Sequence, residues 1–381
     1  MCEFEGGWAG ACPQSGIPRE AMPSQFETVY RSRKVLVTGH TGFKGGWLSS
    51  WLHLLGADVY GMSLEPDTTP SLFNAIGLGD LMRSEIIDIR NAADVRQAVE
   101  ACAPEIVFHL AAQPLVRKSY SDPIETFATN VVGTAAVLDA CRQCSSVKAV
   151  VCVTTDKVYL NKEENHPYVE ADRLGGLDPY SASKACAELV AYVYQRNFHR
   201  AGGLPLIATA RGGNVVGGGD WCSDRIIPDI VRALAARQPL KLRNPAAVRP
   251  WQHVLELCEG YLELGARLFA EERDIADAWN IGPMAESTLT VSELVKLALT
   301  LWKLPEHPVE VERAALHEAQ LLRLNIEKSL QRLNWRPRLS VSKTLTWTVD
   351  WYRDYYEAPA RARDMTFAQI KSFQNMMAPN R

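Results

Sequence analysis

The sequence predicts an α/β fold in which a doubly wound parallel sheet is joined by a smaller, mainly C-terminal lobe. From Lys34 to about residue 210, short and almost continuously apolar segments alternate with amphipathic ones, as expected for strands and helices that follow one another. Strands that are apolar throughout indicate a parallel sheet covered by helices on both faces. After Arg211 the chain is richer in glycine and proline and its elements become shorter. This change predicts the second lobe.

The apolar runs place the expected elements along the chain. Strands are expected at residues 34–38, 59–62, 86–87, 106–108, 150–153 and 206–210, and helices near 43–55, 91–102, 124–142 and 181–199. A strand at 278–281 is expected to return to the sheet, so that the lobes interleave. The predicted units are a sheet domain over 32–211 with a return segment at about 250–282, a second lobe from 212–249 and 283–370, and a tail over 371–381.

The first segment of the chain differs from the rest. Residues 1–31 are rich in glycine, proline and serine and show no apolar periodicity before the first strand. This composition predicts a disordered extension. Translation can start at Met1 or at Met22, and the sequence does not decide between them.

Charge and cysteine content exclude several classes of protein. With 22% charged residues and a net charge of -3, the chain offers no basic field for nucleic acid. The sequence lacks both a run of about 18 apolar residues and a secretory signal, so we expect no membrane binding and a cytoplasmic location. Nine cysteines, an odd number, favour a reducing compartment. Cys141 and Cys144 are interpreted as ordinary thiols rather than a zinc or redox pair, and no metal site is predicted.

Three glycines between the first strand and the first helix form the first chemical motif. Gly39, Gly42 and Gly45 are spaced three residues apart and enclose Thr41 and Phe43. In this context one glycine permits the tight turn, one lets the backbone approach a diphosphate, and one packs the helix on the strand. The motif therefore predicts dinucleotide binding on a Rossmann-type fold.

The glycine spacing resembles that of the extended short-chain dehydrogenase/reductase family. Glu65, after the second strand, is then the candidate acceptor for ribose hydroxyls and favours NAD over NADP; a solvated loop glutamate is the alternative. The resemblance implies that Asp88 and Ile89 contact the adenine and that Ala111 lies beside the cofactor. It also matches residues 130–134, Asn-Val-Val-Gly-Thr, to a helix motif of the family.

Tyr180 and Lys184 form the predicted reactive pair. They are four residues apart and therefore lie on one face of a helix. A nearby cation favours phenolate, so Lys184 is expected to lower the pKa of Tyr180 and make it a base. The alternative is an amphipathic helix with a solvent-facing lysine. By resemblance both residues also contact the cofactor, and Thr155 hydrogen-bonds the reacting hydroxyl.

Asp156 and Lys157 follow Thr155 at the carboxyl end of a strand, where open α/β sheets bind ligands. The stretch 155–159, Thr-Asp-Lys-Val-Tyr, resembles the CDP-glucose 4,6-dehydratases. The dTDP-glucose enzymes have Asp-Glu at this point, so Lys157 departs from that branch. By resemblance Asp156 is the acid for the C6 hydroxyl, and Lys157 is either the C5 base or a cation that stabilises the enolate. A surface ion pair is the structural alternative.

Two later segments are similar to the same family. Residues 211–221 resemble its substrate loop and residues 249–254 its phosphate-contacting stretch. Arg249 is the main candidate for the substrate diphosphate, because a guanidinium donates two hydrogen bonds to phosphate oxygens. Further candidate substrate-binding residues are Asn214, Arg225, Pro228 and Asn280.

The resemblance implies a complete reaction and an assembly. The expected reaction is NAD-dependent dehydration of CDP-D-glucose to CDP-4-dehydro-6-deoxy-D-glucose, by C4 oxidation, elimination across C5 and C6, and hydride return to C6. The product is expected to serve deoxysugar synthesis for surface polysaccharides such as lipopolysaccharide O-antigen. The protein is expected to form a homodimer or homotetramer through the helices that flank the sheet. His40, bulky for its place in the glycine turn, is expected to weaken NAD retention.

Two other functions stay open at this point. One is another NAD-dependent nucleotide-sugar dehydratase or epimerase, acting on a dTDP-, UDP- or GDP-sugar, since the residues do not reveal the nucleobase. An epimerase shares Tyr180 and Lys184 but does not need the Asp156-Lys157 pair. The other is an inactive NAD-binding scaffold, which would be expected to lack Tyr180 or Lys184.

Overall fold

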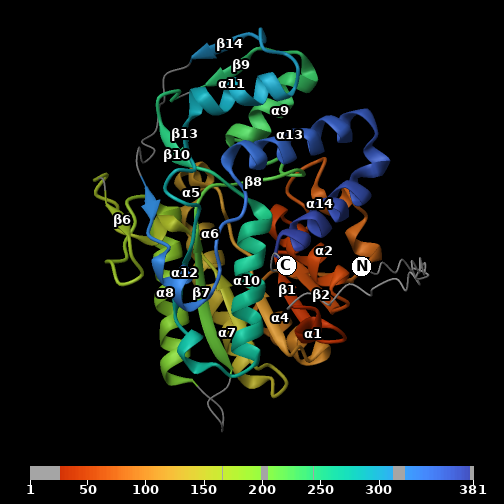
Figure 1. Ribbon diagram of the computed structural model, residues 1–381. Coiled ribbons are helices and arrows are strands. Elements are labelled where there is room, and N and C mark those ends of the chain that lie inside the picture. The colour runs from red at the N-terminus through yellow and green to blue at the C-terminus, as the bar shows by residue number, and fades with distance from the viewer. Residues whose placement is uncertain (1–25, 165, 199–204, 243, 312–321, 378–381) are drawn as a thin grey trace, which may run out of the picture.

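The computed structural model describes residues 26–164, 166–198, 205–242, 244–311 and 322–377. Figure 1 shows a sheet-containing body with a smaller lobe above it, formed by helices and short strands from the middle and the end of the chain. The termini of the drawn ribbon lie on the same side of the body. Among the described residues, no helix combines the length and apolar character needed to span a bilayer.

The central sheet has seven strands in the order β12-β7-β5-β4-β1-β2-β3, and every described pairing in it is parallel. The strands are β1 (Lys34–Thr38), β2 (Asp58–Ser63), β3 (Arg83–Ile86), β4 (Ile106–His109), β5 (Ala149–Val153), β7 (Leu206–Gly212) and β12 (Ala278–Ile281). The chain runs outward from β1 in one direction and from β4 in the other, which creates a crevice at their carboxyl ends. The predicted doubly wound sheet is confirmed.

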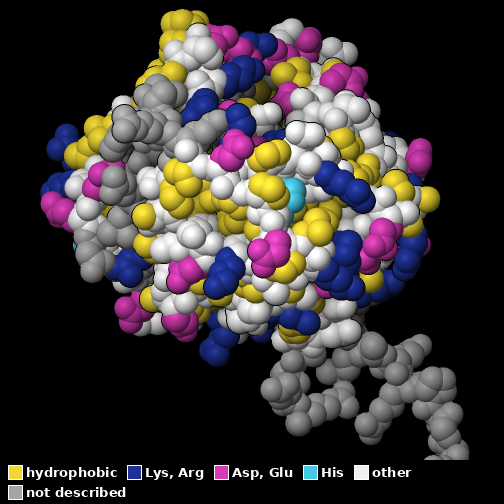
Figure 2. Space-filling view, turned by 90° about the horizontal axis from the view of Figure 1, so that it is seen from above, with side chains coloured by type: hydrophobic (Ala, Val, Ile, Leu, Met, Phe, Trp, Pro, Cys, Tyr) yellow, Lys and Arg dark blue, Asp and Glu magenta, His cyan; other side chains and the backbone are white. Residues whose placement is uncertain are grey.

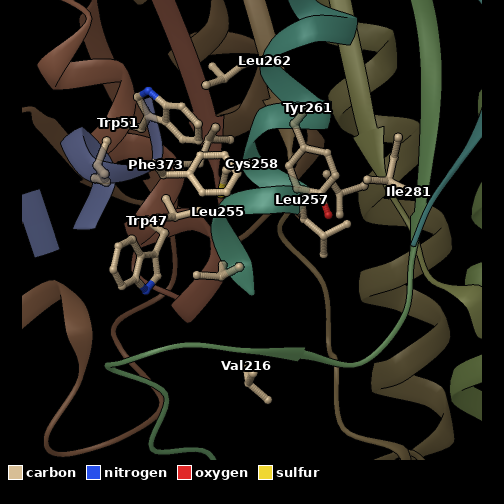
Figure 3. Close-up of a cluster of buried hydrophobic side chains, with 14 of the residues drawn as sticks. Trp47, Trp51, Val216, Leu255, Leu257, Cys258, Tyr261, Leu262, Ile281 and Phe373 are labelled. Atoms are coloured by element: carbon tan, nitrogen blue, oxygen red, sulfur yellow. The ribbon is translucent and has the colours of Figure 1, made fainter. Parts of the chain in front are cut away.

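Helices cover both faces of this sheet. On one face lie α2 (Phe43–Leu54) and α10 (Val254–Phe269); on the other lie α4 (Ala92–Cys102), α7 (Thr134–Gln143) and α8 (Pro179–Asn197). Alternate residues of β1 serve the two faces, since Val35 and Val37 pack with α2 and α10 while Leu36 packs with α4 and α7. Figure 3 shows the first of these cores, with Trp47, Trp51, Cys258, Tyr261 and Phe373 among its side chains.

The smaller lobe contains three longer helices and several two-stranded sheets. The helices are α9 (Ile226–Ala236), α11 (Val291–Leu301) and α13 (Val341–Glu357). Its paired strands are β10 (Val248–Pro250) with β13 (Thr288–Thr290), β9 (Leu240–Leu242) with β14 (Val309–Val311), and β8 (Val215–Val216) with β11 (Gln252–His253). A further pair, β6 (Pro167–Tyr168) with β15 (Arg323–Leu324), lies beside the edge strand β12. The last helix, α14 (Ala362–Met377), is 16 residues long. Short elements complete the described chain: α1 (Glu27–Tyr30), α3 (Leu72–Ala75), η1 (Leu78–Asp80), α5 (Val116–Ser121), α6 (Pro123–Phe127), η2 (Ala128–Gly133), η3 (Asp156–Val158), η4 (Arg273–Ile275), α12 (Glu327–Arg332) and η5 (Pro359–Arg361).

Two terminal segments differ from the expectation. Residues 26–31 were expected within the disordered extension, but α1 is packed: Phe26 and Tyr30 are buried, and the Tyr30 hydroxyl donates to the Leu262 carbonyl at 2.6 Å. Residues 1–25 lie outside the described residues. At the other end, α14 continues through residues 371–377, expected as a tail, and Phe373 meets the Trp51 ring edge-on at 5.7 Å.

The return of 278–281 to the sheet is confirmed, because β12 pairs with β7 in parallel register. The division of the chain into two lobes as domains stays a prediction. Cys141 and Cys144 are buried at the end of α7, and no disulfide joins any two of the seven described cysteines. Figure 2 shows the upper face, where basic and acidic side chains are interspersed among apolar ones.

Candidate active site

A cavity of about 730 Å³ opens at the carboxyl ends of the sheet strands, between the sheet and the smaller lobe. It is bordered by the turns that follow β1, β2, β3, β4 and β5 and by the start of α8. All but one of the predicted site residues line it: Gly39, Thr41, Gly42, Phe43, Gly45, Glu65, Asp88, Ile89, Ala111, Thr155, Asp156, Lys157, Tyr180, Lys184, Asn214, Arg225, Pro228 and Arg249. The fold thus brings together residues from nine separate segments of the chain.

Asn280 is the exception, because the structure does not bring its side chain to the cavity. Its side chain is fully buried, away from the cavity lining. The amide nitrogen donates to the carbonyls of Tyr168 and Asn325, at 2.8 and 3.0 Å, and the amide oxygen accepts from the Tyr159 hydroxyl at 2.6 Å. Its hydrogen-bonding groups are occupied in joining β12 to neighbouring loops.

The glycine turn is shaped for a diphosphate. A Cβ on Gly39, whose φ is +76°, would lie 2.7 Å from the Ala111 nitrogen, and one on Gly45 would lie 2.1 Å from the Gly39 oxygen. At Gly42 the nearest contact would be 3.4 Å away, so its open side faces the cavity. Gly42 is also the N-cap of α2 and supplies no side-chain cap, which leaves the first backbone N–H groups for an anion.

Side chains after β2 and β3 form the far end of the cavity. Thr41 shares a 2.8 Å hydrogen bond with Ser63 and donates to the Leu64 carbonyl at 2.9 Å, which fixes the loop carrying Glu65. Glu65 is exposed at the cavity edge. Hydrogen bonds from Arg90 lower the pKa of Asp88, so the carboxylate predicted to contact adenine is already paired.

His40 lies beneath the turn rather than in the cavity. Its Nε2 is 2.7 Å from the Ser84 hydroxyl, its ring meets Phe73 edge-on, and a Cβ on Gly61 would lie 2.4 Å from its ring. Burial lowers the pKa of His40 to about 4. His40 therefore packs between β2 and β3 as a neutral side chain, and its ring is not placed to crowd a cofactor in the cavity.

Burial dominates the acidity of Tyr180. It raises the pKa of the phenol to about 12, although a hydrogen bond with Thr155 and the charge of Arg225 act in the opposite direction. Sequence reasoning expected Lys184 to lower this pKa. Instead, the Lys184 ammonium donates to the Val153 carbonyl at 2.9 Å, and burial lowers the pKa of Lys184 itself to about 8.

Asp156 and Lys157 occupy a short turn, η3, capped by the hydroxyl of Thr155. Asp156 is only 5% exposed and accepts a hydrogen bond from Thr155 at 3.0 Å, whereas Lys157 is half-buried. Burial raises the pKa of Asp156, while Lys157, the Thr155 hydrogen bond and Lys44 lower it. Because the Asp156 carboxyl is buried in the cavity wall, Asp156 and Lys157 do not form a surface ion pair.

Lys44 lines the cavity and was missed by sequence reasoning. It lies in the first turn of α2, and its pKa is lowered to about 8 by burial and by the charges of Arg225 and Lys184. It also acts electrostatically on Asp156. The signal was present in the sequence, because a lysine in the first turn of a helix opposes the helix dipole and needs a compensating reason.

The cavity wall toward the smaller lobe is basic. Arg225 precedes α9 and forms a 2.8 Å ion pair with the buried Asp220. Arg249 lies on β10 and acts electrostatically on Asp156. Asn214 and Pro228 complete this wall. A diphosphate entering here would meet two guanidinium groups, which suits its charge and geometry.

The chain is similar to known nucleotide-sugar dehydratases. A family model described as GDP-mannose 4,6 dehydratase matches residues 36–348. The CDP-glucose 4,6-dehydratase of Salmonella typhimurium is 43% identical over 353 residues, covering 92% of this chain and 97% of the relative. The dTDP-glucose 4,6-dehydratase of Streptomyces antibioticus is 31% identical over 333 residues, covering 84% and 92%.

The fold also matches that of an enzyme whose structure has been solved. The crystal structure of DesIV, a dTDP-glucose 4,6-dehydratase from Streptomyces venezuelae with NAD and TYD bound, matches with a TM-score of 0.72 at 25% identity and covers 84% of this chain and 97% of that chain. The resemblance to nucleotide-sugar 4,6-dehydratases is thereby confirmed. Because the family model spans most of the chain and a full-length relative is 43% identical, the chain belongs to the GDP-mannose 4,6-dehydratase family.

Proposed function

We propose that the chain catalyses the NAD-dependent dehydration of CDP-D-glucose to CDP-4-dehydro-6-deoxy-D-glucose. The observation that carries this proposal is the placement of Thr155, Asp156 and Lys157 in one cavity with Tyr180 and Lys184. An oxidation needs only a base and a cofactor, whereas elimination of water also needs an acid and a proton acceptor. The nucleobase follows the relative from Salmonella typhimurium, whose name specifies CDP-glucose.

The cavity fits NAD at its sheet side. The open face of Gly42 and the first turn of α2 would hold the diphosphate, and Glu65 would accept hydrogen bonds from ribose hydroxyls. Tyr180 and Lys184 would lie at the nicotinamide end. When bound there, NAD would supply the hydride chemistry of the reaction, acceptance from C4 and donation to C6.

Side chains of the cavity would accept and donate the protons of the reaction. Tyr180 would take the proton of the C4 hydroxyl, which Thr155 orients; with a pKa of about 12, the phenol needs an added positive charge to ionise, and the oxidised nicotinamide brings one. The C4 ketone then acidifies the C5 proton. Asp156 would protonate the leaving C6 hydroxyl, a role that suits a carboxyl whose pKa burial raises.

Lys157 would serve the C5 position, either as the base that takes the proton or as the cation that stabilises the enolate. Its half-buried position directly after Asp156 supports both roles. On the opposite wall Arg225 and Arg249, with Asn214 and Pro228, would bind the nucleotide diphosphate of the substrate.

Incubation with a panel of nucleotide-glucoses tests this function. With NAD present, CDP-glucose should lose one water, as read by product mass, and no net NADH should appear at 340 nm, because the hydride returns to the sugar. Steady NADH accumulation would indicate a simple dehydrogenase. Equal turnover of UDP-glucose or dTDP-glucose would remove the CDP assignment and leave the dehydratase standing.

We also propose that the protein acts as a homodimer or homotetramer in the cytoplasm and supplies deoxysugars for surface polysaccharides such as O-antigen. Leu189 and Tyr192 on α8 are 55% and 56% exposed, and Ile124 on α6 is 79% exposed. An exposed apolar face over adjacent sheet-flanking helices supports association with a second copy. No disulfide joins any two of the described cysteines, which suits a reducing compartment.

A further inference from the structure

A buried carboxylate lies directly behind the reactive pair. Glu188 follows Lys184 by one turn of α8, as Lys184 follows Tyr180, so the three side chains share one face of the helix. Tyr180 and Lys184 line the cavity, whereas Glu188 is only 3% exposed and lies behind it. A charged group in such a place requires compensation and calls for a functional reason.

The Glu188 carboxylate accepts hydrogen bonds from three residues, at the end of β5 and on β7. Thr154, at the end of β5, donates to Oε1, and Thr209 on β7 donates to Oε2 at 2.8 Å. Arg211, also on β7, donates to Oε2 at 2.8 Å and forms a buried ion pair. Since replacing a buried ion pair by well-packed apolar residues is often neutral for stability, stability alone does not explain this arrangement.

The same helix thus holds two consecutive residues at the end of β5, its last residue Val153 and the next residue, Thr154. Lys184 donates to the Val153 carbonyl at 2.9 Å, and Glu188 accepts from the Thr154 hydroxyl. The next residues of the chain are Thr155, Asp156 and Lys157. These two contacts fix the distance between Tyr180 on the helix and the acid-base residues on the strand end.

Glu188 also sets the charge around Lys184. The titratable groups that face Lys184 are Glu188, Cys152 on β5, His109 on β4 and Lys44 on α2, with Tyr180 one turn earlier on α8. Burial lowers the pKa of His109 to about 3 and raises that of Cys152 to about 12, so both are uncharged at neutral pH. Lys44 is a like charge. Of these groups, Glu188 supplies the negative charge.

We propose that Glu188 is a positioning residue for the reaction: it holds the Thr155-Asp156-Lys157 segment against α8 and keeps Lys184 cationic. This inference rests on the proposed function in so far as Tyr180 and Lys184 perform C4 oxidation. The Glu188–Arg211 pair then maintains the geometry and the charge of the site, in addition to joining α8 to the sheet.

The test measures the titration of Lys184 directly. Trace labelling with acetic anhydride across a pH series, read by mass spectrometry of the Lys184 peptide, should give a lower midpoint in Glu188→Gln than in the unsubstituted protein. A midpoint lower by about one pH unit reduces the protonated fraction at pH 8 about fivefold. The kcat for CDP-glucose should then fall several-fold more at pH 8 than at pH 6.5.

Thr209→Val is the matched control, because it removes a hydrogen bond to the same carboxylate oxygen and leaves the charge of Glu188 in place. Its Lys184 midpoint should equal that of the unsubstituted protein, and circular dichroism should show that all three proteins are folded. An unchanged midpoint in folded Glu188→Gln, or an equal shift in Thr209→Val, would overturn the proposal. If no nucleotide-glucose were turned over, the proposed function would fail, while the labelling would still decide the role of Glu188.

Discussion

At the residue scale, burial raises the pKa of both Tyr180 and Asp156. The proposed dehydration uses this property of both side chains. Asp156 can then carry a proton to a leaving hydroxyl. Tyr180 stays protonated until a positive charge arrives beside it, so proton removal at C4 is coupled to the presence of oxidised cofactor. Lys44 and Lys184 each have a pKa lowered to about 8. Both therefore add positive charge to the cavity at neutral pH, and both lose part of that charge at alkaline pH.

Replacing Lys157 separates oxidation from elimination. Lys157→Met should still permit hydride transfer from C4, so NADH and the 4-keto-glucose nucleotide should accumulate in a single turnover. Exchange of the C5 hydrogen with heavy water should be much slower than in the unsubstituted enzyme. Asp156→Asn, the matched variant, should impair C6 dehydration with less effect on C5 exchange. Dehydration by Lys157→Met at close to the normal rate would show that the lysine takes no part in elimination.

Arg249 lines the cavity, and we propose that it binds the substrate diphosphate rather than takes part in the chemistry. A charge-assisted contact that is equal in the ground and transition states affects KM more than kcat. Loss of such a hydrogen bond costs about 1.5–3 kcal/mol, so Arg249→Ala should raise KM for CDP-glucose about ten- to hundredfold with kcat nearly unchanged. Initial-rate kinetics provide the measurement. An unchanged KM would place the diphosphate elsewhere in the cavity.

The sequence predicted those site residues that local motifs define, such as Gly39 in its turn and Tyr180 on its helix. It misjudged residues whose role depends on tertiary surroundings. Asn280 is joined to loops more than 40 positions distant in the chain, and no local pattern reveals this. His40 lies in the right motif but packs beneath the turn, against Ser84 on β3. Burial, which only the folded chain creates, raises the pKa of Tyr180.

At the element scale, the strands found most reliably are those buried on both faces. β1, β4 and β5 are continuous apolar runs, so their sequences identify them. β3 is the edge strand, and all four of its residues are exposed; the apolar pair Ile86-Ile87 therefore suggested a position slightly too late. The four residues of α1 are too few to show a helical period.

The last helix gives an element-scale prediction. Phe373 is fully buried between α14 and α2, although sequence reasoning placed it in a tail. Truncating a buried phenylalanine costs about 3–5 kcal/mol, so Phe373→Ala should lower the free energy of unfolding in urea by about that amount. Met376→Ala, at a 39% exposed position of the same helix, should change it by about 0.5 kcal/mol or less. Equal effects would mean that α14 does not pack on α2.

At the scale of the whole molecule, the order of the strands explains why residues from distant segments meet. The chain turns in opposite directions from β1 and β4, and the turns after both strands open into the same crevice. The smaller lobe then closes the crevice with Arg225 and Arg249. The sequence predicted this layout because alternating strands and helices allow few arrangements. The family resemblance named Arg225 and Arg249, which line the cavity, but sequence reasoning missed Lys44.

The proposed homo-oligomer gives a prediction at the scale of the whole molecule. If α8 and α6 form the interface between copies, Leu189→Glu should reduce the molecular mass in light scattering to that of a smaller species. Val309→Glu introduces the same charge at a 41% exposed apolar residue of β14, in the smaller lobe, and should leave the mass unchanged. Identical masses for the two variants would place the interface elsewhere or leave the protein monomeric.

In the proposed reaction, one hydride leaves C4 and returns to C6 of the same sugar. The decisive measurement is mass and NMR spectroscopy of the product formed from CDP-glucose that carries deuterium at C4, in ordinary water with unlabelled NAD. The expected product is a 4-keto-6-deoxy sugar whose deuterium is found in the C6 methyl group. Deuterium retained in the reduced cofactor, or an unlabelled C6 methyl group, would contradict the proposed reaction.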